Sequence, residues 1–132
     1  VITVELTGVG IVKCKNLVVG RSEFIGSTQR GIRNDALNFS TIERDLYGNA
    51  SMVQRRNVPK VSMSLIADKS LINPISKLRS NLDAVPAVWS GLDEDTSNDY
   101  YESLLILGFY KTFSINIDNP IIITVSLDLE EV

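Results

Sequence analysis

The sequence has no histidine and only one cysteine, Cys14, among its 132 residues. Histidine is the commonest general base and, together with cysteine, forms most zinc sites, so zinc binding and Cys–His or Ser–His catalysis are not expected. The 8 glycines match neither the dinucleotide-binding fingerprint nor the phosphate-binding loop, which argues against nucleotide use. We therefore expect no cofactor, no metal site and no enzymatic activity.

Long apolar runs and an excess of positive charge are also missing. No apolar run approaches the roughly 20 residues that cross a bilayer, so membrane insertion is not expected. The net charge of −3 gives no general attraction to phosphate backbones, and nucleic acid is not expected as a partner. Cys14 cannot form an internal disulfide, and its neighbours predict a half-buried strand position for it. The length predicts one β-rich domain over residues 1–132.

The clearest period in the sequence lies in residues 104–129. After Gly108, alternation predicts a strand whose core face carries four apolar residues, Phe109, Phe113, Ile115 and Ile117. The turn formers Asp118-Asn119-Pro120 follow, and then a second alternating run, Ile121, Ile123, Val125, Leu127 and Leu129. Together these runs predict a hairpin whose apolar face needs a second layer to cover it.

The first half of the chain also alternates, but less regularly. The pattern predicts strands over residues 2–6, 11–15 and 61–65. Residues 21–34 lack any period and predict a long loop of the kind that carries contacts. Residues 36–47 alternate only weakly, and they end at the turn formers Tyr47-Gly48-Asn49.

One short helix is predicted from Asn73, a favourable N-cap, with Pro74 at the first helical position. Ile75, Leu78 and Leu82 would then share its apolar face. Because strands dominate, the predicted fold class is mainly β: an antiparallel β-sandwich or curved sheet with one or two short helices.

Several groups of side chains are candidates for binding. The acidic residues between Asp93 and Asp99 lack the spacing of an EF-hand loop and predict a solvated loop. Glu43 and Asp45 could pair in glycoside hydrolysis, although their pattern is that of ordinary surface charges. Aromatic rings can stack on sugars, and the candidates for this role are Trp89, Tyr100, Tyr101 and Tyr110.

Charged loops suggest a contact between copies of the chain. The loop over residues 21–34 is basic, whereas the loop over residues 93–99 is acidic. Two copies could therefore meet head to tail with opposite charges facing. The candidate interface residues are Arg21, Arg30, Arg33, Asp93, Asp95 and Asp99.

The C-terminal third contains a distinctive pattern: Val88-Trp89-Ser90-Gly91, Tyr100, Leu107-Gly108-Phe109-Tyr110-Lys111-Thr112-Phe113-Ser114-Ile115, Pro120 and Leu127-Asp128-Leu129-Glu130. This pattern resembles the small structural tail proteins of tailed bacteriophages, which belong to the tail tip or baseplate. The resemblance implies a virion subunit, assembled in the host cytoplasm, whose partners are other phage tail proteins and copies of itself. Some relatives in this class are carbohydrate-binding, so the alternative is a sugar-binding β-sandwich module that attaches the particle to a cell-surface glycan.

Overall fold

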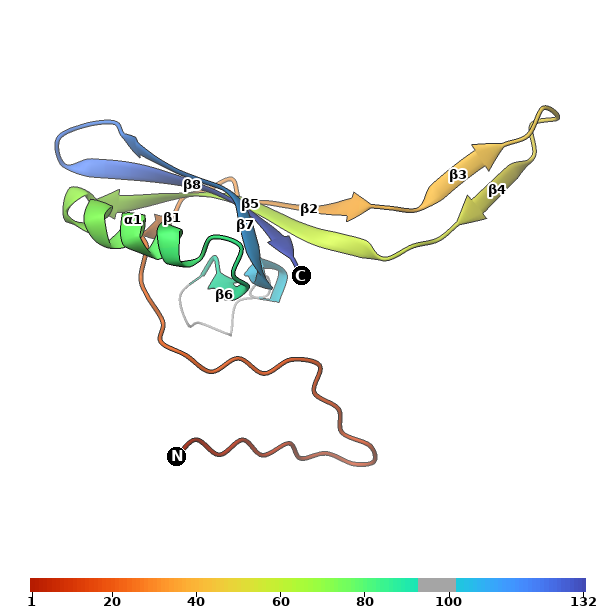
Figure 1. Cartoon of the computed structure of the whole chain (residues 1–132), viewed down its shortest axis with the longest axis horizontal. Helices are drawn as coiled ribbons and strands as arrows, with labels where there is room; N and C mark the ends of the chain where they lie inside the picture. The colour runs from red at the N-terminus through yellow and green to blue at the C-terminus, as the bar shows by residue number, and fades with distance from the viewer. Residues whose placement is uncertain (93–101) are drawn as a thin grey trace.

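The computed structural model describes residues 1–92 and 102–132. It is mainly β, with 45% strand and 12% helical residues, and its antiparallel sheet curls into a half-barrel beside one short helix, α1 (Ile72–Asn81) (Figure 1). The mainly β fold class is confirmed. Of the two architectures that the sequence allowed, the curved sheet is the one found.

Three long antiparallel strands form the centre of the half-barrel, with β8 (Ile122–Glu131) between β5 (Asn57–Asp68) and β7 (Leu105–Ile117). The predicted C-terminal hairpin is thus confirmed as β7 and β8. Its turn is stabilised by Asn119, whose Oδ1 accepts hydrogen bonds from the backbone N–H groups of Ile121 and Ile122, at 2.9 and 2.8 Å.

Short strands complete the sheet on both sides. Strand β6 (Ala87–Ser90) pairs with the first residues of β7, whereas β1 (Ser27–Thr28) and β2 (Arg33–Asn38) pair with successive parts of β5. A hydrogen bond from Thr28 Oγ1 to the carbonyl of Gly91, at 2.7 Å, joins β1 to the residue that follows β6. The two edges of the sheet therefore approach each other at this end of the half-barrel.

The core lies on the inner face of the curled sheet. Alternate residues of β5 and β8 are buried there, and they are Val61, Met63, Leu65, Ala67, Ile123, Val125, Leu127 and Leu129. Helix α1 adds Ile75, which is only 1% exposed. Burying each of the larger side chains contributes about 1.5–3 kcal/mol relative to leaving it in water, so this face dominates the stability of the fold.

Strand β7 changes its inward-facing set of residues at Lys111. Tyr110 pairs with Leu129 and Thr112 pairs with Asp128, so Lys111 is the extra residue of a β-bulge. The bulge shifts the alternation by one position, and Phe109, which pairs with Glu130, therefore lies on the outer face. The prediction that Phe109 shares the core face with Phe113 is wrong for this reason.

Gly108 allows β7 to pass very close to β8. A Cβ atom at this position would overlap the carbonyl oxygen of Glu130. The carbonyl of Gly108 also accepts a hydrogen bond from Trp89 Nε1, at 3.1 Å, so the buried indole keeps a polar partner. Gly108 and Trp89 are thus both required by packing at the crossing of β6, β7 and β8.

Helix α1 begins at Ile72, directly after a 3₁₀ turn, η1 (Lys69–Leu71), so the prediction of Asn73 as N-cap and Pro74 as the first helical residue is wrong: they are the second and third residues of the helix. The carboxylate of Asp68 caps this turn by accepting a hydrogen bond from the backbone N–H of Ser70, at 2.8 Å. The predicted apolar face is confirmed, because Ile75 is buried and both Leu78 and Leu82 are half-buried.

The first 26 residues, called here the N-terminal arm, contain no strand or helix. The strands predicted over residues 2–6 and 11–15 are wrong, because alternation gives a segment the pattern of a strand but not a neighbour to pair with. Figure 1 shows the arm leading away from the half-barrel. Cys14, predicted to be half-buried, is exposed in this arm.

A second projection is formed by β3 (Thr41–Arg44) and β4 (Ala50–Val53), which pair in a separate two-stranded sheet. Together with their flanking residues they form residues 39–56, called here the hairpin arm, which extends far from the half-barrel as a continuation of β2 and β5 (Figure 1). The hydroxyl of Ser40 accepts a hydrogen bond from the backbone N–H of Arg55, at 3.0 Å. This bond joins the two segments of the hairpin arm between the β2–β5 pair and the β3–β4 pair.

The bulge predicts different costs for two phenylalanines of the same strand. Phe113 is 7% exposed and packs edge-to-face on Trp89 and Tyr110, with ring centroids 6.4 and 5.4 Å away. Phe113→Ala should lower the free energy of unfolding by about 3–5 kcal/mol in a denaturant titration. Phe109→Ala, on the outer face, is the matched control and should cost about 1 kcal/mol or less. Equal losses for the two variants would contradict the bulge.

Candidate assembly interface

The N-terminal arm exposes an unusual number of large apolar side chains. Its first six residues expose Ile2, Val4 and Leu6 to 69%, 48% and 54%, and further along it exposes Val9, Ile11, Val12, Leu17, Val18, Val19 and Phe24. Segments that remain unfolded in water are usually polar and highly charged, because they have too little apolar surface to bury. The arm has the opposite composition, because many of its side chains are large and apolar.

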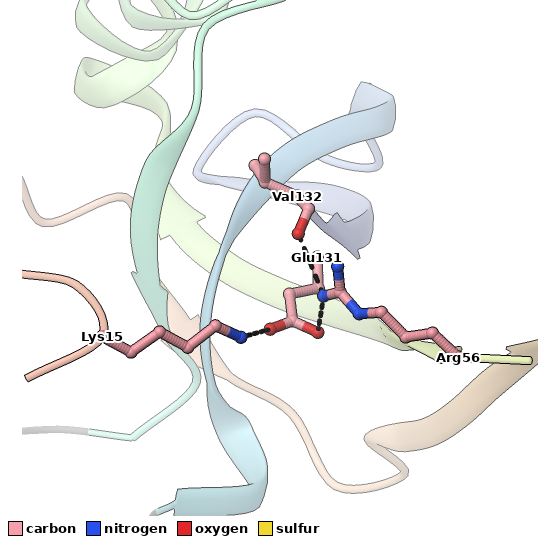
Figure 2. A network of polar contacts seen from close by, with 4 residues as sticks. All are labelled: Lys15, Arg56, Glu131 and Val132. Carbon is pink, nitrogen blue, oxygen red and sulfur yellow. Dashed lines mark hydrogen bonds and ion pairs between the residues drawn. The ribbon is translucent and has the colours of Figure 1, made fainter.

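A small cluster of charges ties the N-terminal arm to the sheet (Figure 2). Glu131, at the end of β8, accepts from Arg56 with a distance of 2.9 Å between Nη2 and Oε2, and its Oε1 lies 3.8 Å from Lys15 Nζ. Arg56 Nη2 also donates to the carbonyl of Val132, at 3.1 Å. Because Lys15 and Arg56 are both well exposed, each ion pair contributes at most about 1 kcal/mol, so Lys15 holds the arm only weakly.

The tip of the hairpin arm is a turn built around Asp45. Asp45 Oδ1 accepts from the backbone N–H groups of Tyr47 and Asn49, at 2.9 and 2.8 Å, while Oδ2 accepts from Asn49 Nδ2 at 2.9 Å. Gly48, with φ of +84°, supplies the left-handed conformation that the turn requires. Both carboxylate oxygens of Asp45 thus accept hydrogen bonds inside the turn.

This turn holds two large apolar side chains out in solvent. Leu46 is 100% exposed and Tyr47 is 90% exposed, and the strands behind them expose Ile42 and Met52. The turn was predicted from the sequence, but the exposure of Leu46 and Tyr47 on it was not. The signal was present, because Asp45 and the pair Gly48-Asn49 are turn formers that enclose two residues usually found in a core or an interface.

A cleft with a volume of about 310 Å³ opens between β2 and the start of β7. Its walls include Asn34, Ala36, Pro59, Leu105 and Leu107. The two carboxylates at its margin are already engaged, since Asp35 pairs with Arg33 and Glu131 pairs with Arg56. Within residues 1–92 and 102–132, no group of three or more acidic or cysteine side chains could hold a metal ion.

The predicted basic contact residues are all exposed. Arg21 lies in the N-terminal arm, Arg30 between β1 and β2, and Arg33 at the start of β2, where its Nη2 lies 3.1 Å from the carboxylate of Asp35. The loop that was predicted to end at residue 34 therefore contains β1 and the start of β2. Asp93, Asp95 and Asp99, the acidic half of the predicted contact, lie outside the described residues.

Two of the four rings proposed for sugar stacking are used inside the protein. Trp89 is 7% exposed, and Tyr110 packs on Phe113 and donates from its hydroxyl to the carbonyl of Arg79, at 2.9 Å. The bulge at Lys111 is what turns Tyr110 inward. Trp89 is thus a core residue and Tyr110 is half-buried, and sugar stacking by these two rings stays a prediction. Tyr100 and Tyr101 lie outside the described residues.

No protein-family model matches the chain, and no curated protein is similar to it in sequence at a significant level. Among the helices of the described residues, none has the length and apolar character needed to cross a bilayer. In the described part of the chain, the candidate contact surfaces are the exposed apolar residues of the two arms and the charged cluster of Lys15, Arg56 and Glu131.

Hydrogen bonds from the side chain and backbone of Asn49 hold the pKa of Asp45 below its ordinary value of 3.8. A lowered folded-state pKa means that the carboxylate stabilises the turn above the unfolded pKa and that this contribution is lost as the pH falls through the folded-state pKa. An NMR titration should therefore give Asp45 a midpoint below 3.8, shared by the amide shifts of Tyr47 and Asn49. Asn49→Ala should raise the midpoint. A wild-type midpoint at or above 3.8 would contradict the turn described here.

Proposed function

We propose that the chain is a structural subunit of a multi-copy protein assembly, acts through protein–protein contacts, and serves in the tail of a tailed bacteriophage at the tail tip or baseplate. The first part of this proposal is supported by the two apolar arms. Soluble monomers rarely expose large contiguous apolar patches, and those that do use them for binding. Here the exposed apolar residues are concentrated on two projections rather than scattered over the sheet.

The observation that carries the proposal is the tip of the hairpin arm. A turn that is fixed by the carboxylate of Asp45 holds Leu46 and Tyr47 in solvent, where neither side chain stabilises the subunit. Contacts at interfaces are strongest where an aromatic side chain enters a partner from a backbone that is already ordered, because less conformational entropy is lost on binding. The tip has this form.

The phage-tail part of the proposal is supported by the resemblance within residues 88–130. Trp89, Gly108 and Phe113 from that pattern meet in the core, so the resemblance concerns packing of a subunit rather than a shared binding site. A subunit of this kind works through contact area and needs no catalytic group. The location in the particle follows from the resemblance alone.

The hairpin tip supplies a test of assembly. The wild-type protein should self-associate in sedimentation velocity over a concentration series, and the double variant Leu46→Ser, Tyr47→Ser should associate at least about tenfold more weakly. Its melting temperature as a monomer should not change, because both side chains are exposed. The matched control is Ile121→Ser, since Ile121 is 68% exposed in the β7–β8 turn, at the opposite end of the molecule in Figure 1. Wild-type protein that stays monomeric at every concentration contradicts self-assembly.

The virion context needs a separate measurement. Mass spectrometry of purified particles of the phage whose genome encodes this chain should detect the chain in several copies per particle. Antibody labelling should place it on the tail in electron micrographs. Particles that contain every other tail protein but lack this chain would contradict the phage-tail proposal, whatever the outcome of the sedimentation experiment.

A further inference from the structure

Strand β7 has a stretch of free edge. It pairs with β8 as far as Ile117, whereas β6 pairs with its other edge only from Leu105 to Gly108. After the bulge at Lys111, no strand of the described residues pairs with this second edge. The stretch from Thr112 to Ile117, called here the open edge, therefore has backbone groups on one side that lack a ladder partner among residues 1–92 and 102–132.

One hydrogen bond shows which backbone groups face the open edge. Arg79 Nη1, on helix α1, donates to the carbonyl of Phe113 at 3.3 Å, so this carbonyl points away from β8. Because backbone groups alternate in direction along a strand, those of Ile115 and Ile117 point the same way. A further strand could thus pair with residues 113, 115 and 117.

The open edge lacks the features that normally prevent such pairing. Natural edge strands are protected by charged side chains, prolines or bulges, but Thr112 to Ile117 contains no charge and no proline. The bulge lies just before it, at Lys111. The side chain of Arg79 donates to the carbonyl of Phe113 and would have to give up this hydrogen bond for a strand to pair there.

The N-terminal arm contains a segment with a matching pattern. In residues 2–7, Ile2, Val4 and Leu6 alternate with Thr3, Glu5 and Thr7, and all six are exposed. Placed antiparallel along the open edge, with residue 2 beside 117, this segment puts its three apolar side chains next to Ile117, Ile115 and Phe113. Its polar residues then lie next to Asn116, Ser114 and Thr112, so both faces match over the six positions.

We propose that residues 2–7 of one copy add as a strand to the open edge of β7 in a second copy. This inference rests on the proposed function and names the contact by which one copy holds the next. Main-chain hydrogen bonds provide the affinity, and the alternating side chains fix the register. An exchange that joins the arm of each copy to the edge of the next is a heterologous contact, which forms rings or filaments.

The occupant is a second copy because the single chain leaves both halves of the contact unused. Figure 1 shows the arm leading away from the sheet, and its first six residues are exposed while the edge of β7 is open. Lys15, which is paired with Glu131, ties the later part of the arm to the sheet. The segment before it projects from the subunit as a strand donor, so the experiment has to distinguish pairing with a neighbour from pairing with the same chain.

The first test uses proline in the arm. Val4→Pro removes the backbone N–H that would donate to the open edge, and proline is unfavourable within a strand. The fold of the subunit should stay intact, because residues 2–7 have no strand or helix in the single chain. Self-association, measured by sedimentation velocity, should weaken at least about tenfold. Val9→Pro is the matched control, because Val9 lies in the same arm, is also exposed, and falls outside residues 2–7. This control should associate like the wild-type protein.

The second test uses charge on the strand pair. In the proposed register Glu5 lies beside Ser114, so Ser114→Glu should weaken association by repulsion, and Glu5→Lys should restore it in the same chain. The matched control is Ser126→Glu. Ser126 pairs with Ser114 but lies on β8, one strand further from the edge, and is half-buried like Ser114. The control should associate close to normally, whereas rescue by Glu5→Lys would have no explanation if Ser114→Glu only damaged the fold.

The possible results separate this inference from the proposed function. Wild-type protein that is monomeric at every concentration overturns both. Assembly that is unchanged by Val4→Pro overturns the strand addition and leaves the role as an assembly subunit standing. A lower melting temperature for Val4→Pro at concentrations where the protein is monomeric shows that the segment pairs with its own chain, and this also overturns the exchange between copies.

Discussion

The pairing of β8 with both of its neighbours is the constraint on which the rest of the structure depends. Val61 of β5 faces Leu129, and Phe113 of β7 faces Leu127, so one strand aligns the inward residues of the other two. These positions are almost fully buried, and a slip of one residue would turn the whole set to solvent. The bulge at Lys111 and the close approach at Gly108 are local adjustments that let β7 follow this alignment while the sheet curls.

The residues that stabilise the fold and the residues available for contact lie in different parts of the molecule. The half-barrel and helix α1 contain most of the residues that are buried within the described chain, whereas the N-terminal arm and the hairpin arm contain most of its exposed large apolar residues. The contacts between the two parts are the ion pairs of Lys15 and Arg56 with Glu131 and the packing of Ile25 against the core. Changes in the arms are therefore expected to alter association with little effect on folding, because the affected side chains are not part of the core.

The hydrophobic pattern of the sequence correctly predicted the elements whose contacts are made by residues nearby in the chain. The β7–β8 hairpin and helix α1 follow from alternation, from the turn at Asn119 and from Pro74 in the first turn of the helix. The bulge could not be predicted from the pattern, because Phe109, Phe113 and Ile115 occupy every second position on both sides of Lys111, as in a regular strand. Residues 2–6 and residues 61–65 alternate in the same manner, yet only the latter meet another strand, since pairing depends on residues far away in the chain. The burial of Trp89 and the half-burial of Tyr110 are decided by long-range packing, so an aromatic residue alone could not distinguish a core from a binding surface.

The position of β8 in the sequence also governs when the subunit can fold during synthesis. Every other strand leaves the ribosome before it, and until β8 is available, β5 and β7 share no partner and their inner faces stay unpaired. Pairing over such long sequence separations is slow, because the entropy of closing a large loop is lost before the contacts form. The nascent chain therefore has its arms in solvent before it has a completed sheet to receive them. The proposed strand addition thus needs a chain that has been translated through β8, and chaperones that shield apolar segments would act on the exposed arms before that point.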